Sequence, residues 1–152
     1  MSIDDRLAEL GLELPEAASP VAAYVPTVQA GGLLHISGQL PFRDGRLIAG
    51  RCGDDADEEL GRIAAERCAL MLLAQIKAAL GSLDRVERFV KLGVFVSSAP
   101  TFTAQAKVAN GASELLEKVL GEAGKHARSA VGVAVLPLGA VVETDAIVAV
   151  RD

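Results

Sequence analysis

Charged side chains set among aliphatic residues near the end of the chain are the groups that could do chemistry. Arg128 opens the apolar run 127–135, and Glu143 and Asp145 lie within a second apolar run, 141–150. A guanidinium stays protonated and offers a fixed fork of N–H donors that fits a carboxylate. Charges among β-branched residues cost free energy unless they are paired or serve a ligand. The pattern indicates a small anion-binding site with a proton-handling carboxylate nearby.

The same charges also have a simpler interpretation. An arginine at the start of a strand often faces water at the rim of a sheet. Glu143 and Asp145 are two residues apart, so they share one face of a strand, and a solvated face would accommodate both. The residues alone leave both interpretations open.

Hydrophobic periodicity predicts the elements that must position these groups. The expected order is a helix over 3–10, strands over 22–29, 33–37 and 46–48, a helix over 54–80, a strand over 86–96, a helix over 101–120, and strands over 127–135 and 141–150. Leu136-Pro137-Leu138-Gly139 predicts a turn that joins the last two strands as a hairpin. In that register Arg128 lies opposite Ile147 and Gly132 opposite Glu143, which separates Arg128 from Glu143 by roughly 13 Å along the strands.

Two helices on one face of a mostly antiparallel sheet make an α+β layer. The other face of that sheet carries Val, Ile and Leu and has nothing to cover it. Exposed apolar patches of that size mark association, and such sheets can close around a three-fold axis. We therefore expect the protein to self-associate.

Three blocks of the chain follow one recognisable order of residues. They are Tyr24-Val25 with Gly31 and the strand end 36–41 (Ile-Ser-Gly-Gln-Leu-Pro), the helix start 102–110, and Arg128 with Leu136-Pro137 and Glu143, the glutamate lying 15 residues after the arginine. From about Tyr24 to Val150 this order resembles the Rid family of imine and enamine deaminases. These YjgF-type proteins are also described as L-PSP endoribonuclease-like.

The resemblance implies a chorismate-mutase-like fold, a homotrimer and a site in each cleft between subunits. The implied reaction is hydrolysis of a reactive 2-imino acid to a 2-oxo acid and ammonia, with no cofactor. Arg128 would bind the substrate carboxylate and Glu143 would activate or position water. The resemblance also places Tyr24 at the substrate as a lid, Ser37 as a polar contact and Ala130 through its backbone carbonyl. Asn110 is a poor helix former in the middle of a predicted helix, so we expect it to make a polar contact with the substrate.

The chain departs from the family pattern in several places. Ala130 stands where many members have a cysteine, and His126 replaces a proline two residues before the arginine. Residues 1–20 form an N-terminal extension with a short helix that many members lack, and segment 45–59 is longer than usual. We expect a single Rid-like domain over 21–152. A drifted pocket leaves a second possibility open, a trimer that binds small carboxylates without catalysis.

Composition limits the partners and the compartment. The formal charge of −5 and an aromatic content of 3% disfavour nucleic acid, so an endoribonuclease is the weaker alternative. Cys52 and Cys68 are too few and too far apart for a disulfide scaffold or a zinc knuckle, and no metal site is expected. The longest uncharged apolar stretch, 68–76, is too short to span a membrane. The start lacks the basic and apolar regions of a signal peptide. We expect a cytoplasmic protein.

Overall fold

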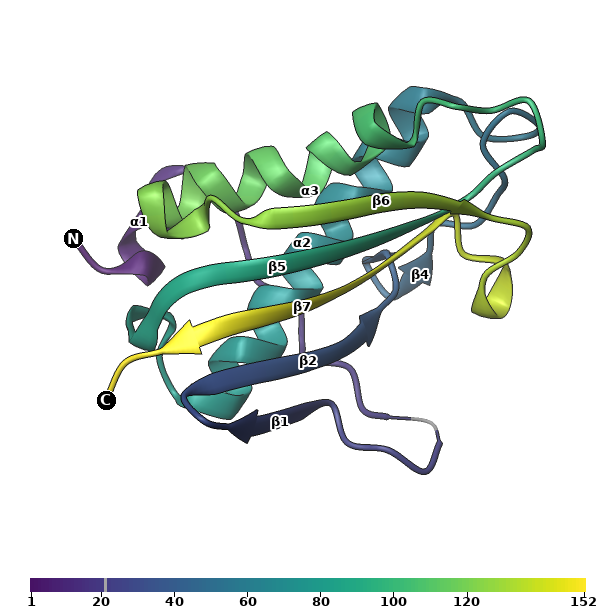
Figure 1. Cartoon of the computed structure of the whole chain (residues 1–152). Helices are drawn as coiled ribbons and strands as arrows, with labels where there is room; N and C mark the ends of the chain where they lie inside the picture. Colours follow the sequence, from purple (N-terminus) through teal and green to yellow (C-terminus); the bar gives the residue numbers. More distant parts are fainter. Residues whose placement is uncertain (21) are drawn as a thin grey trace.

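A five-stranded sheet forms one layer and the helices form the other in the computed structural model, which describes residues 1–20 and 22–152 (Figure 1). The elements in chain order are α1 (Ile3–Glu9), β1 (Thr27–Ala30), β2 (Leu33–Gln39), β3 (Phe42–Arg43), β4 (Arg46–Leu47), α2 (Glu58–Leu80), β5 (Val86–Ser97), α3 (Gln105–Leu120), β6 (Ala127–Val133) and β7 (Val142–Val150). Short 3₁₀ turns occur at Leu83–Arg85 (η1), Gly121–Gly124 (η2) and Pro137–Gly139 (η3). The α+β class and the two long helices on one face are confirmed.

The strand order in the main sheet is β1-β2-β7-β5-β6, and β3 pairs with β4 separately. Neighbours in the main sheet are antiparallel, except that β5 and β6 run parallel. Parallel neighbours require a long crossover, and α3 supplies it. The sheet is therefore mixed and mostly antiparallel.

The predicted hairpin between 127–135 and 141–150 is wrong. β5 lies between β6 and β7 and pairs with both, so these last two strands do not touch through their backbones. The connection over 134–141 is long enough to step across one strand, a distance of roughly 10 Å between the outer two strands. β5 has apolar residues on both faces and suits an interior position, where it takes a partner on each side.

The starts of several elements differ from the sequence expectation for local reasons. α2 begins after Asp57, whose side chain accepts a hydrogen bond from the Leu60 backbone N–H and so caps the helix. β1 begins only at Thr27, because Pro26 has no backbone N–H to contribute to a ladder. α2 ends as expected at Gly81, which has a left-handed φ of 82°.

The core lies between the sheet and the two long helices. α2 packs against β7 and β2, while α3 packs against α2, β6 and β5. The residues of α3 that face the sheet and α2 are buried: Val108, Ala112, Leu115, Leu116 and Val119. The N-terminal segment joins this body, since Leu7 is buried and Arg6 Nε donates to the Lys118 carbonyl at 3.0 Å.

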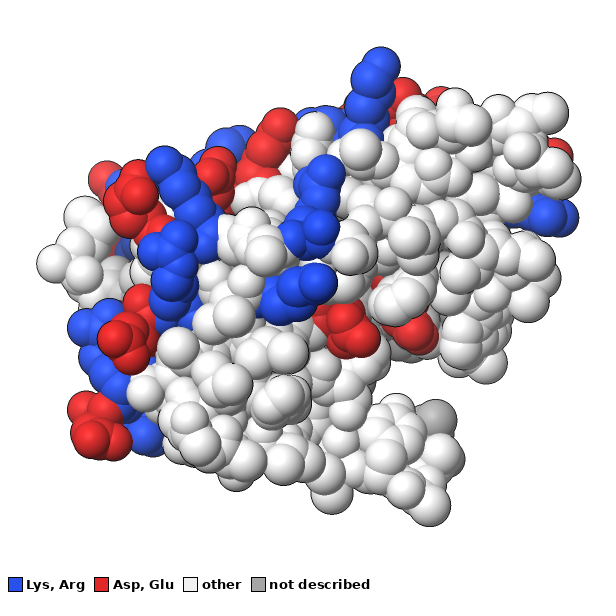
Figure 2. Space-filling model, in the orientation of Figure 1, with Lys and Arg blue, Asp and Glu red and all other residues white. Residues whose placement is uncertain are grey.

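The other face of the sheet is not covered by any element of the described residues (Figure 1). Val28, His35, Ile147, Phe95 and Val131 point to this side, because their strand neighbours are buried against the helices. Val28 and Val131 are 52% and 45% exposed. Figure 2 shows a broad, mostly uncharged surface with acidic groups near its middle and Lys or Arg side chains next to them. We call this surface the outer sheet face.

Candidate functional site

Arg128 is the second residue of β6 and points to the helix side of the sheet. Its Nη1 donates to Oδ1 of Asn110 at 2.9 Å and to Oγ of Ser113 at 3.1 Å, and its Nη2 donates to the Ala106 carbonyl at 3.4 Å. The side chain is half-buried against α3. The arginine is thus held by neutral acceptors from a single helix.

These contacts leave part of the guanidinium available. A guanidinium has five N–H donors, and three are used by Asn110, Ser113 and Ala106. Within residues 1–20 and 22–152 no carboxylate pairs with Arg128, and its Nε makes no hydrogen bond. The Nε and Nη2 donors lie on one edge and can bind both oxygens of a carboxylate. This edge suits an anion supplied from outside the chain.

Ser113 and His126 support the arginine, and sequence reasoning missed both. His126 Nδ1 lies 2.6 Å from the Gly124 carbonyl, which can only accept, so Nδ1 carries the proton. In the neutral ring Nε2 then accepts from the Ser113 hydroxyl at 2.9 Å, and that oxygen accepts from Arg128. Ser113 lies three residues after Asn110 on the same side of α3, a spacing that could have revealed it. His126 has no such signal.

Glu143 and Asp145 lie on the outer sheet face, each over a glycine. A Cβ built on Gly38 would lie 3.0 Å from Cδ of Glu143, and one on Gly93 would collide with Oδ1 of Asp145. Burial, and secondarily the charge of Asp145, raise the pKa of Glu143. Burial also raises the pKa of Asp145, opposed by its own backbone N–H and by Lys91. A carboxyl with a raised pKa suits proton transfer near neutral pH.

Arg128 and Glu143 do not meet within one chain. Arg128 is level with Ala146 across β5, so Glu143 lies three residues further along β7 and two strands away. That places their backbones roughly 14 Å apart, about 10 Å along and 10 Å across the strands. The two side chains also point to opposite faces of the sheet. The separation expected from the hairpin therefore persists, for a different structural reason.

The other predicted site residues fall into two groups. Asn110 contacts Arg128, and Ala130 lies two residues further along β6 on the same half-buried side. Ser37 lies in β2, and its hydroxyl donates to the Val25 carbonyl at 2.8 Å. Tyr24 is 48% exposed and lines a cavity of about 180 Å³ together with Gly38. The Glu143 side chain packs against Gly38, which lines this cavity, and Gly38 belongs to β2, toward the opposite end of the sheet order from β6.

Neither cysteine offers a reactive thiol. Both are free and buried, and Cys68 donates to the carbonyls of Gln39 and Val142. Burial raises the pKa of Cys68, and burial with neighbouring Asp57 and Asp55 raises that of Cys52 to about 11. No cluster of His, Cys, Asp or Glu that could hold a metal occurs in the described part of the chain. Nor is any helix there long and apolar enough to cross a membrane.

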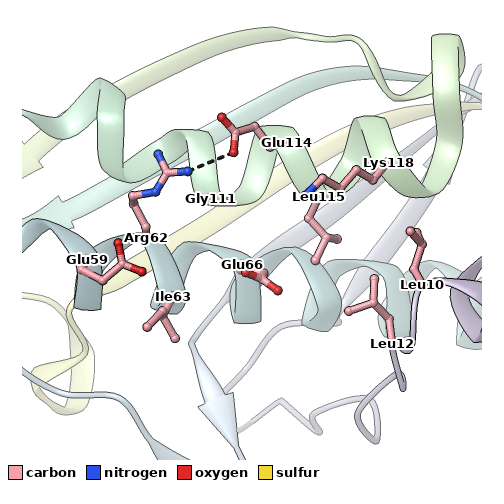
Figure 3. Close-up of a pocket in the computed structure, with 10 residues that line it drawn as sticks. All are labelled: Leu10, Leu12, Glu59, Arg62, Ile63, Glu66, Gly111, Glu114, Leu115 and Lys118. Atoms are coloured by element: carbon pink, nitrogen blue, oxygen red, sulfur yellow. Dashed lines mark hydrogen bonds and ion pairs between the residues drawn. The ribbon is translucent and has the colours of Figure 1, made fainter.

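A larger hollow of about 340 Å³ lies on the far side of the helices, between α2, α3 and the N-terminal segment (Figure 3). Arg62 crosses it to pair with Glu114 at 2.9 Å, and Leu10 and Leu12 close one end. None of the site residues predicted from the sequence lines it. The residues that could act on a substrate therefore lie on and around the sheet, and not in this hollow.

Comparison with known proteins gives consistent matches over most of the chain. A family model described as "YjgF/chorismate_mutase-like, putative endoribonuclease" matches residues 4–147. Protein TCP17 of Trypanosoma cruzi is 54% identical over 144 residues, covering 93% of this chain and 90% of that protein. The Agrobacterium tumefaciens protein Atu1372, of unknown function, is 50% identical with a TM-score of 0.92, covering 98% of this chain and 92% of that one.

The fold also matches RidA from an Antarctic Psychrobacter species, at 31% identity and a TM-score of 0.62. That alignment covers 89% of this chain and 94% of RidA. The family match includes most of the segment 1–20, all of β6 with Arg128, and β7 from Val142 to Ile147 with Glu143. The chain therefore belongs to the YjgF/chorismate mutase-like family.

Proposed function

We propose that this protein hydrolyses reactive 2-imino or enamine acids to 2-oxo acids and ammonia in a cleft between subunits. The observation that carries the proposal is the free donor edge of Arg128, a half-buried cation held only by neutral groups. Such an edge fits the carboxylate that every 2-imino acid carries. Similarity to a protein named RidA supports the same reaction class.

The reaction needs only an anchor and a proton carrier. Arg128 binds the substrate carboxylate through two N–H donors. Glu143 takes a proton from water as the water oxygen adds to C2 of the imine, and it returns the proton to the nitrogen. Glu143 then takes the proton of the new hydroxyl group and passes it to the amine, so that the tetrahedral intermediate expels ammonia and leaves the 2-oxo acid. The raised pKa of Glu143 improves both transfers, because an acid–base catalyst works best with a pKa near the working pH.

The two groups come together only if subunits associate. Within one chain they lie on opposite faces of the sheet, and the outer sheet face carries exposed apolar side chains that nothing among the described residues covers. We propose a homotrimer in which each cleft combines Arg128 of one subunit with Glu143 of a neighbour. Packing outer faces together also removes apolar side chains such as Val131 from water.

A coupled assay tests the reaction directly. An amino-acid oxidase makes the 2-imino acid in situ, and its decay is followed with and without the protein. We expect faster decay with the parent protein and no acceleration with Arg128→Ala. An unchanged decay rate with the parent contradicts the proposed reaction.

A second function follows from the distance between Arg128 and Glu143. If no neighbour supplies the glutamate, Arg128 still binds a carboxylate, and the protein is a non-catalytic binder. Binding of a 2-oxo acid without imine hydrolysis would identify this case. We do not extend endoribonuclease activity to this chain, because its charge of −5 gives no basic footprint for phosphates. We also propose a cytoplasmic location, which the two free thiols support because cytosolic proteins keep their cysteines reduced.

A further inference from the structure

The cavity of about 180 Å³ beside Glu143 has an uncharged wall. Its apolar part comes from Pro26, Leu40, Phe42, Leu138 and the ring of Tyr24. Two amides complete it, those of Gln39 and Gln75, which are only 5% and 3% exposed. None of the described residues that line it carries a charge.

The N-terminal segment closes one side of this cavity. Ala18, Ser19 and Pro20 line it, although they lie far from its other residues in the sequence. Gln75 of α2 fixes the segment by donating from Nε2 to the Ala18 carbonyl at 2.7 Å. The same Nε2 lies 3.5 Å from Oε1 of Gln39, whose own Nε2 donates to the Ser37 carbonyl at 3.1 Å. A buried amide relay therefore joins the segment to β2.

Gly38 connects the cavity to the proposed proton carrier. It lines the cavity, and a Cβ at this position would lie 3.0 Å from Cδ of Glu143. A substrate whose reacting carbon contacts Glu143 can therefore direct its side chain into the cavity. Any larger residue at position 38 would displace the Glu143 carboxyl, which packs directly against this glycine.

We infer that this cavity is the substrate side-chain pocket, and that residues 18–20 make it selective for uncharged, mainly apolar side chains. The inference rests on the proposed function, because it assigns the substrate class of that site. A volume of about 180 Å³ holds roughly six non-hydrogen atoms, taking ~30 Å³ for each as for liquid water. Side chains of branched aliphatic size fit, whereas a carboxylate would be buried without a basic partner.

Calorimetric titration with 2-oxo acids measures the preference independently of catalysis. The probes are pyruvate, 4-methyl-2-oxopentanoate and 2-oxoglutarate. We expect 4-methyl-2-oxopentanoate to bind more tightly than pyruvate, by at most ~50-fold for three more buried carbons. We expect 2-oxoglutarate to bind more weakly than 4-methyl-2-oxopentanoate, by at least about tenfold. Equal affinity for all three acids overturns the inference.

Two variants locate the preference in the pocket. Ala18→Phe fills the cavity and should reduce the preference for 4-methyl-2-oxopentanoate over pyruvate about tenfold, with pyruvate affinity kept within twofold. Leu138→Ala changes a side chain that is 77% exposed, so it leaves folding intact and should weaken only the larger acid, by about threefold. Ala8→Phe, on the exposed side of α1, is the matched control and should change nothing.

The outcomes separate this inference from the proposed reaction. A preference for the branched acid that both pocket variants reduce supports the pocket, even if the parent hydrolyses no imine and the proposed reaction fails. Imine hydrolysis with a preference that neither variant alters overturns the pocket and leaves the reaction standing. Failure to bind any of the three acids contradicts both.

Discussion

Replacement of Arg128 tests the anchor most directly. Its free edge can make two charge-assisted hydrogen bonds to a carboxylate, and hydrogen bonds to charged groups contribute roughly 1.5–3 kcal/mol each. The side chain is only half-buried, so solvent screening reduces the sum, and we take about 2–4 kcal/mol for the pair. Arg128→Ala should therefore weaken 2-oxo-acid binding by roughly 30- to 1000-fold.

Arg128→Lys distinguishes the fork from the charge. An ammonium keeps the charge but cannot hold Asn110 and Ser113 while presenting two parallel donors to a ligand. We expect it to recover no more than about tenfold of the lost affinity. Both variants should also lose imine hydrolysis in the coupled assay.

Calorimetric titration with 4-methyl-2-oxopentanoate measures these losses of affinity. Arg88→Ala is the matched control and should leave the affinity unchanged, because Arg88 is an exposed arginine of β5 away from the site. Thermal unfolding should show that each variant remains folded. If Arg128→Ala binds the acid within twofold of the parent, Arg128 is a rim charge and the anchor assignment is refuted.

Three further predictions concern the proton carrier, the support of the arginine and the assembly. Glu143→Gln should keep 2-oxo-acid binding within a few-fold and slow turnover about 100-fold, and a turnover loss below threefold would remove the glutamate from the mechanism. The folded-state pKa of Glu143 lies above its ordinary value of 4.5, so the folded protein binds more protons than the unfolded chain. The contribution of Glu143 to stability is therefore present at low pH and is lost as the pH rises through the raised pKa, and the unfolding free energy of Glu143→Gln should not show this loss. Turnover by the parent protein should rise over the same pH range, because Glu143 acts as a base only when it is deprotonated. Ser113→Ala should raise the KM about tenfold with a smaller change in kcat, since it loosens Arg128 without touching the reacting atoms, and a change in kcat alone would contradict that role. Light scattering should give three times the chain mass of 15.7 kDa, Val131→Glu should shift it toward a single chain, and a monodisperse single chain for the parent would exclude the trimer.

The sequence predicted the kind and order of the main elements because their periodicity is strong and local. α2 and α3 carry long apolar stripes, and the glycines at 31, 32 and 81 end their elements with left-handed φ values. The pairing of the last two strands was wrong because a Leu-Pro-Leu-Gly turn shows only that the chain reverses. It does not show which strand enters beside it, since that choice depends on β5 needing a partner on both sides.

The charged residues of the candidate site could be predicted from the sequence, but the residues that hold them in place could not. Arg128 and Glu143 stand out as charges within apolar strands, and Asn110 as a poor helix former within a helix. His126 and Gln75 look ordinary in the sequence, because their roles arise from contacts with Ser113 and with the Ala18 carbonyl that only the fold creates. The face that each charge occupies likewise depends on strand order.

The position of β6 at the edge of the sheet has a consequence for local opening of the protein. In a single subunit β6 pairs only with β5 among the described strands, so half of its backbone amides have no ladder partner. Edge elements open at lower free energy than interior ones, and their amide hydrogens exchange faster with solvent. A carboxylate that links Arg128 to a neighbouring subunit would stabilise this edge strand against opening. Bound ligand should therefore slow deuterium uptake in residues 127–133, while the rate of uptake in β7 stays unchanged.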